Sequence, residues 1–117
     1  MRPKRRDSES LLPLTPAMFH VLIALADAER HGYAIIKEIA RRTDGDLRLS
    51  AGTLYALVRR FVAEGVIEES DERPDPSLDD ERRRYYRLTP FGRDLARAEA
   101  RRLETLIVMA RSKHLLA

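Results

Sequence analysis

The chain has 117 residues, of which 44% are hydrophobic and 35% are charged, and its net charge is +3. This composition is typical of one globular domain and excludes a disordered chain. Cysteine is absent, which excludes disulfides, thiolate zinc sites and cysteine nucleophiles and fits a reducing cytoplasm. We therefore expect a cytoplasmic protein, and its charge balance permits nucleic-acid binding without requiring it.

No segment suggests a membrane span, a signal peptide or a metal site. The longest uncharged stretch, residues 11–26, is shorter than the ~20 residues of a membrane helix and is interrupted by prolines. The segment MRPKRRDSES lacks the apolar run of a signal peptide. The histidines are scattered without ligand spacing, so we expect them at helix ends or on the surface, with no metal or cofactor.

The first segment, residues 1–13, is expected to be a flexible basic arm. Four positive charges lie close together in it: Arg2, Lys4, Arg5 and Arg6. Such an arm either remains solvated or contacts phosphates and the minor groove of DNA, and the sequence leaves both readings open.

A first helix is predicted over residues 15–29, since Thr15 fits an N-cap and Pro16 the first helical position. Its apolar residues recur at helical spacing and form two adjacent faces. One face holds Met18, Val21, Leu22 and Leu25, and the other holds Phe19, Ile23 and Ala26. A stripe this wide predicts cover on more than one side.

A second helix should begin near Gly32 and end before a polar turn at Gly45. Its inward residues are Ile35 or Ile36, Ile39 and Ala40, and its outward residues are Lys37, Arg41 and Arg42.

A third helix is predicted between an N-cap at Ser50 and a stop at Gly65. Its inner face holds Leu54, Leu57, Val58 and Phe61. Its outer face holds Thr53, Ala56, Arg59 and Arg60, with Tyr55 at the flank. The outer face contributes little to a core, so another role is expected for it.

Two short strands, at 66–70 and 82–88, should pair as an antiparallel wing. The loop between them, residues 71–81, carries six acids and one arginine, so DNA phosphates should repel it. Arg82, Arg83 and Arg84 lie at the base of this wing. The acidic tip either swings away from DNA or pairs with these arginines.

Thr89 and Pro90 predict the start of a long last helix. Its apolar residues cover about half the circumference, more than the ~100° that a single contact requires. Part of it can pack on its own domain, and the residues that we assign to a partner chain are Ala100, Leu103, Ile107 and Ala110. A homodimer is therefore expected, with the first helix adding Phe19 and Ile23; the alternative is a helix folded back on its own core.

Three helices followed by a two-stranded wing predict a mainly α (α+β) fold, the winged helix-turn-helix. We place it at residues 14–89, with the dimerisation helix at 90–117. The major groove of B-DNA, about 12 Å wide, admits one helix held from behind by a core. The candidate DNA-binding residues are Tyr33, Ser50, Gly52, Thr53, Tyr55, Arg59, Arg60, Arg83 and Arg84.

Each candidate on the third helix has a chemical role. The helix N-terminus at Ser50, Gly52 and Thr53 suits a phosphate, because its N–H groups and dipole favour negative charge. Arg59 or Arg60 would pair with guanine or neutralise phosphate, and Tyr55 would meet a phosphate or a thymine methyl.

Three blocks of this sequence resemble the PadR family of transcriptional regulators: HGYAI at 31–35, GTLYALVRRFVAEGVI at 52–67 and RRRYYRLTPFGR at 82–93. The resemblance implies a homodimeric repressor of a nearby promoter, with two copies of helix 50–64 reading an inverted repeat in double-stranded DNA. It suggests dimerisation through the last helix, and control of stress, efflux or detoxification genes. Some family members respond to small aromatic compounds.

The sequence departs from the family pattern at Ala56, where the family usually has proline, and in its acidic wing. Tryptophan is absent, which argues against an aromatic-drug pocket, so a small-molecule effector is left unidentified. The main alternative is a winged helix that binds proteins. An enzyme is not expected, because no phosphate loop, metal spacing or nucleophile motif is present.

Overall fold

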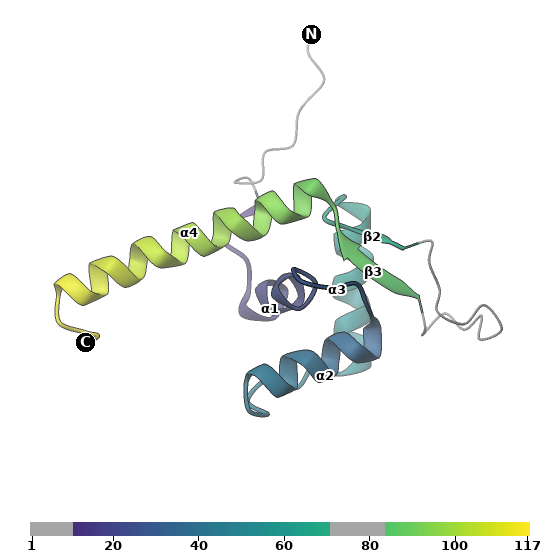
Figure 1. Ribbon diagram of the computed structural model, residues 1–117, viewed down its shortest axis with the longest axis horizontal. Helices are drawn as coiled ribbons and strands as arrows, with labels where there is room; N and C mark the ends of the chain where they lie inside the picture. The colour runs from purple at the N-terminus through teal and green to yellow at the C-terminus, as the bar shows by residue number, and fades with distance from the viewer. Residues whose placement is uncertain (1–10, 71–83) are drawn as a thin grey trace, which may run out of the picture.

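The computed structural model describes residues 11–70 and 84–117 and is drawn in Figure 1. Its elements in chain order are α1 (Pro16–Ala24), β1 (Arg30–His31), α2 (Gly32–Arg42), α3 (Ala51–Ala63), β2 (Ile67–Glu69), β3 (Tyr85–Leu88) and α4 (Pro90–Ser112). The charged part of the predicted arm, the acidic wing tip, Arg82 and Arg83 lie outside the described residues.

Hydroxyl side chains begin three of the four helices in the described ranges, as the sequence predicts. The hydroxyl of Thr15 accepts a hydrogen bond from the N–H of Met18 at 3.2 Å. Ser50 does the same for α3 and Thr89 for α4, at 3.1 Å and 2.9 Å. Each cap satisfies an N–H that has no partner within its helix, so the predicted helix starts are confirmed.

The start of α2 has a different cap. Nδ1 of His31 accepts a hydrogen bond from the N–H of Ala34 at 3.1 Å. The predicted position of a histidine at a helix end is thus confirmed, although its capping role was not foreseen. The first helix is shorter than predicted, because α1 ends at Ala24 and not near residue 29. Nε of Arg30 donates to the carbonyl of Ala24 at 2.7 Å and satisfies a carbonyl left open by that ending.

The wing contains one more strand than predicted. The three strands are antiparallel in the order β1-β3-β2, with Arg30 opposite Tyr86 and Ile67 opposite Leu88. The two-residue strand β1 has no signal of its own in the sequence, because only its pairing with β3 defines it. The predicted winged helix-turn-helix is confirmed, with a three-stranded sheet.

The core lies between the helices and the inner face of the sheet. Its fully buried side chains include Leu22, Ile35, Ile39, Leu54 and Leu95, which come from all four helices. Burying an aliphatic side chain of this size contributes about 1.5–3 kcal/mol. Gly65 has a φ of +75° at the turn after α3, which confirms the predicted stop.

Among the described residues, the last helix packs on the domain through its first half. Leu95 is fully buried, whereas the side chains of Val108 and Met109 are 60% and 56% exposed. Figure 1 shows the C-terminal half of α4 projecting beyond the other elements. This helix therefore carries an uncovered apolar surface away from the wing.

Candidate nucleic-acid interface

The N-terminus of α3 is open to solvent. Ser50, Gly52 and Thr53 are all exposed, and the hydroxyl of Ser50 also donates to that of Thr53 at 3.0 Å. A Cβ added to Gly52 would meet no atom within 4 Å, so the fold itself does not require a glycine there. These three predicted residues lie together at one helix end, where backbone N–H groups favour an anion.

The two arginines of α3 differ in their surroundings. Nε of Arg60 forms an ion pair with Glu64 at 2.8 Å. Arg59 is exposed and makes no ion pair with any residue that the structure describes. Arg59 is thus the cation of this helix that is available to an external anion.

The two predicted tyrosines occupy different positions. Tyr55 is half-buried, and its hydroxyl packs so closely against Gly32 that a Cβ there would overlap with it. Tyr33 is 60% exposed on α2, and Nζ of Lys37 lies 5.0 Å from the centre of its ring. Tyr55 therefore joins α3 to the start of α2, and Tyr33 with Lys37 forms an exposed pair on the neighbouring helix.

The wing arginines of the described strand are paired with acids. Arg84 contacts Glu69 at 3.1 Å, and Arg87 contacts Glu68 at 3.0 Å and Glu29 at 3.3 Å. The hydrogen bond that Arg87 donates to Glu68, and next the one that it donates to Glu29, raises the pKa of Arg87. These partners reduce the positive charge that the base of the wing presents. These acids belong to β2 and to the segment before β1.

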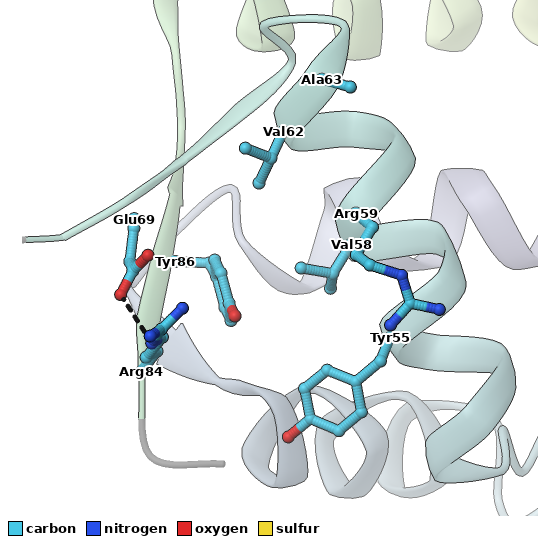
Figure 2. Close-up of a pocket in the computed structure, with 8 residues that line it drawn as sticks. All are labelled: Tyr55, Val58, Arg59, Val62, Ala63, Glu69, Arg84 and Tyr86. Atoms are coloured by element: carbon cyan, nitrogen blue, oxygen red, sulfur yellow. Dashed lines mark ion pairs between the residues drawn. The ribbon is translucent and has the colours of Figure 1, made fainter. Parts of the chain in front are cut away.

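A hollow of about 510 Å³ separates α3 from the wing. Figure 2 shows Val58, Val62 and Tyr86 pointing into it, with the Arg84–Glu69 pair on the wing side and Tyr55 at one end. Arg59 and Ala63 complete its lining. Two predicted DNA-binding residues of α3 therefore also border a cavity, which the sequence did not reveal.

A cluster of charged residues missed by the sequence reasoning holds α2 in place. The carboxylate of Glu38 is buried and accepts hydrogen bonds from Arg42 at 2.9 Å, from Arg41 at 2.7 Å and from Arg30 at 3.3 Å. The bonds from Arg42 and then Arg41 lower its pKa from 4.5 to about 2. Its sequence signal was an acid on the inner face of a helix, with arginines three and four residues later.

The predicted dimerisation residues lie on two helices. Ile23 is 37% exposed on α1, and Phe19 is half-buried beside it. On α4, Ala100 is exposed, Leu103 and Ala110 are half-buried, and Ile107 is 39% exposed. Leu106, Val108 and Met109 are also exposed on this half of α4, by 48%, 60% and 56%.

Other kinds of site find no support in the described part of the chain. Residues 11–70 and 84–117 contain no group of three or more His, Asp or Glu side chains placed to hold a metal ion. No helix in these ranges is long and apolar enough to cross a membrane.

The chain is similar to the members of a known protein family. The model of the transcriptional regulator PadR-like family matches residues 21–98, which run from α1 through the wing into α4. The chain belongs to this family. The membership confirms the resemblance seen in the three sequence blocks, and the matched range contains α3 and both of its arginines.

Individual relatives agree with the PadR-like assignment. The chain is 38% identical over 87 residues to the transcriptional regulator Rv3488 of Mycobacterium tuberculosis, covering 74% of this chain and 75% of that protein. The structure of a transcriptional regulator from Clostridium thermocellum matches with a TM-score of 0.67 at 25% identity, over 81% of this chain and 89% of that one. Bacillus subtilis PadR, solved in complex with operator DNA, shares the fold with a TM-score of 0.61 at 19% identity, over 74% of this chain and 47% of that one.

Proposed function

We propose that this PadR-like regulator acts as a homodimeric, sequence-specific repressor of a nearby promoter, with α3 in the major groove of an inverted-repeat operator. Residues 14–89 would form the DNA-binding domain and 90–117 the dimerisation helix. Control of stress, efflux or detoxification genes is the role that family resemblance favours.

The observation that carries this proposal is the outer face of α3. It combines an open helix N-terminus with an arginine, Arg59, that is exposed and unpaired among the described residues. The opposite face, through Leu54 and Val58, is buried in the core. A helix anchored from behind and polar in front is what groove recognition requires. Phosphate contacts would come from the α3 N-terminus and from Tyr33 and Lys37 on α2.

Dimerisation would present two copies of α3 to one operator. The apolar surface of α4 supports this arrangement, because it continues for several turns past the last contact with the domain core. Large uncovered apolar surfaces on a small protein mark sites of association. A two-fold dimer reads a two-fold operator, with half-sites one helical turn or a multiple of it apart.

The test is fluorescence anisotropy with labelled DNA from upstream of the gene that encodes the chain, against scrambled DNA, at two salt concentrations. A specific regulator should prefer its own promoter and lose affinity with salt, by about 0.9 log units per log salt for each phosphate contacted. Footprinting would then find the two half-sites.

Two results would count against the proposal. Equal binding to both DNAs would contradict sequence specificity. No binding at either salt concentration would favour a winged helix that binds a protein partner, for which the ion-paired base of the wing supplies a surface of mixed charge.

A further inference from the structure

The first turn of α2 is tied to the wing through His31. This residue ends β1 and lies opposite Tyr85 of β3, and the centres of the two rings are 5.4 Å apart in an edge-to-face contact. Nδ1 of the same imidazole accepts the hydrogen bond from the N–H of Ala34 that caps α2. The position of this turn therefore depends on the wing.

Tyr55 of α3 lies against the same turn. Gly32 directly follows His31 and is buried. A Cβ added to Gly32 would lie 2.6 Å from Oη of Tyr55, 2.9 Å from its Cζ and 3.0 Å from its Cε1. All three atoms belong to one side chain, so the phenol ring rests on the backbone of Gly32. Figure 2 shows this ring extending away from α3, with its hydroxyl at the far end.

The glycine at position 32 is required by this contact and not by the backbone conformation. The φ of Gly32 lies outside the left-handed region that favours glycine, whereas the φ angles of Gly45 and Gly65 are +80° and +75°. Within a helix, glycine is less favourable than alanine because it loses more conformational freedom on folding. What Gly32 provides is room for the ring of Tyr55.

We propose that Tyr55 is a positioning residue for DNA binding, an inference that rests on the proposed function. Its ring, resting on Gly32, sets the distance between α3 and the junction of α2 with the wing. These three elements would face the operator together, so their spacing must match the DNA. Arg59 lies one turn after Tyr55 on the same side of α3, so a displacement of α3 at Tyr55 also displaces Arg59.

Direct contact with DNA is the role of Tyr55 that the sequence suggested, and the geometry favours the supporting role over it. The side chain is half-buried. Its hydroxyl, the group that a phosphate would need, is the atom nearest to the Cβ position of Gly32. The hydroxyl therefore faces the start of α2.

A methyl group at position 32 would disturb this spacing. Because atoms in ordinary contact are about 3.5–4.0 Å apart, the Cβ of an alanine would displace the ring of Tyr55 by about 1 Å. Functional groups must be held within ~0.5 Å of their productive positions. A displacement passed on to α3 would therefore weaken DNA binding.

The first experiment measures the contact without DNA, by urea unfolding of the wild type, Gly32→Ala, Tyr55→Leu and the double variant. Gly32→Ala should raise the unfolding equilibrium constant about tenfold alone and less than about threefold beside Tyr55→Leu, because leucine leaves room for the methyl group. Gly52→Ala, whose Cβ meets only open space, is the matched control and should have the same small effect in both backgrounds. Equal effects of Gly32→Ala in both backgrounds would overturn the contact.

The second experiment measures the affinity for labelled promoter DNA by fluorescence anisotropy, with circular dichroism to show that each variant is folded. Tyr55→Phe keeps the ring on Gly32 and should bind within about twofold of the wild type, whereas a lost hydrogen bond to phosphate would cost about tenfold. Gly32→Ala and Tyr55→Leu should each bind about tenfold more weakly, and the double variant little more weakly than either. A tenfold loss for Tyr55→Phe would show that its hydroxyl contacts DNA and would overturn the positioning role.

The remaining outcomes separate the positioning role from the proposed function. A ring that swings aside without moving α3 would leave the DNA affinity of Gly32→Ala unchanged, which would overturn the positioning role while the regulator function stands. If Gly32→Ala alone does not fold, equal affinities of Tyr55→Leu and the wild type would overturn that role in the same way. Equal binding of promoter and scrambled DNA by the wild type would overturn the proposed function and the role of Tyr55 in it, and the unfolding experiment would still decide the contact.

Discussion

The carboxylate of Glu99 accepts a hydrogen bond from the backbone N–H of Leu14 at 2.9 Å and so joins α4 to the segment that leads into α1. Glu99 is buried, and Arg102, one turn later, neutralises it. The hydrogen bonds from Arg102, and next that from Leu14, lower the pKa of this carboxyl. Glu99 is the last buried residue of α4, and beyond it the helix leaves the core.

Replacing Glu99 by alanine should destabilise the fold by about 1–3 kcal/mol, because the N–H of Leu14 would lose its partner within the protein. Urea unfolding at one fixed protein concentration measures the change. Glu104→Ala, an exposed position on the same helix with no described ion pair, should stay within about 0.5 kcal/mol of the wild type. Equal stabilities of the two variants would show that the Glu99–Leu14 contact does not hold α4.

Because the carboxylate of Glu38 is buried and paired with arginines, the folded protein should lose stability in acid. Its pKa is lowered from 4.5 to about 2, so its contribution is complete above pH 4.5 and disappears as the pH falls toward 2. Two of its arginine partners are 68% and 49% exposed, so after allowance for solvent screening we expect about 1–2 kcal/mol.

Thermal unfolding between pH 5 and pH 2 checks this prediction. Glu38→Gln should melt below the wild type at pH 5 and approach it at pH 2, because the wild-type carboxyl is then protonated. Glu104→Gln is the matched control and should follow the wild-type curve throughout. A constant gap between Glu38→Gln and the wild type would exclude titration of Glu38 as the cause of its effect.

Replacement by alanine should have opposite effects on stability at Gly92 and at Gly52. A Cβ on Gly92 would overlap with the carbonyl oxygen of Val66, so Gly92→Ala should destabilise the fold by about 1–3 kcal/mol. A Cβ on Gly52 meets only open space, so Gly52→Ala should leave stability unchanged or raise it by up to about 1 kcal/mol. Melting temperatures compare the two. If Gly52→Ala lowers DNA affinity without lowering stability, the glycine is needed so that the backbone of α3 can lie close to DNA.

The sequence predicted those parts of the fold that local chemistry determines. Thr15, Ser50 and Thr89 are caps because a hydroxyl beside the first helical turn satisfies an open N–H wherever it occurs. The end of α1 and the strand β1 were missed, because each depends on Arg30, whose position is set by long-range pairing with β3. The same limit applies to the site, where residues of α3 and β3 enclose a hollow together.

The dimer prediction concerns the projecting half of α4. Leu103→Asp or Ile107→Asp places a charge within the uncovered apolar surface, where burial against a partner would leave it unpaired. Either variant should dissociate the dimer, as measured by sedimentation equilibrium at several concentrations. Thr105→Asp, exposed on the opposite side of the same turn, should remain dimeric. Dimeric behaviour of both leucine and isoleucine variants would show that the interface lies elsewhere.

The last prediction is that the two arginines of α3 contribute unequally to DNA binding. Arg59 is unpaired among the described residues, whereas Arg60 is held by Glu64 at 2.8 Å. Arg59→Ala should therefore weaken promoter binding by about tenfold or more, and Arg60→Ala should weaken it less. Neither should change the melting temperature much, since both side chains are exposed.

The salt dependence of DNA binding, measured by fluorescence anisotropy, then shows whether Arg59 contacts a phosphate or a guanine. A phosphate contact would lower the slope of log affinity against log salt by about 1 and weaken promoter and scrambled DNA alike. A guanine contact would instead reduce the preference for the promoter. Equal losses for Arg59→Ala and Arg60→Ala would mean that the ion pair with Glu64 opens on DNA, because a paired arginine would then contribute as much as an unpaired one.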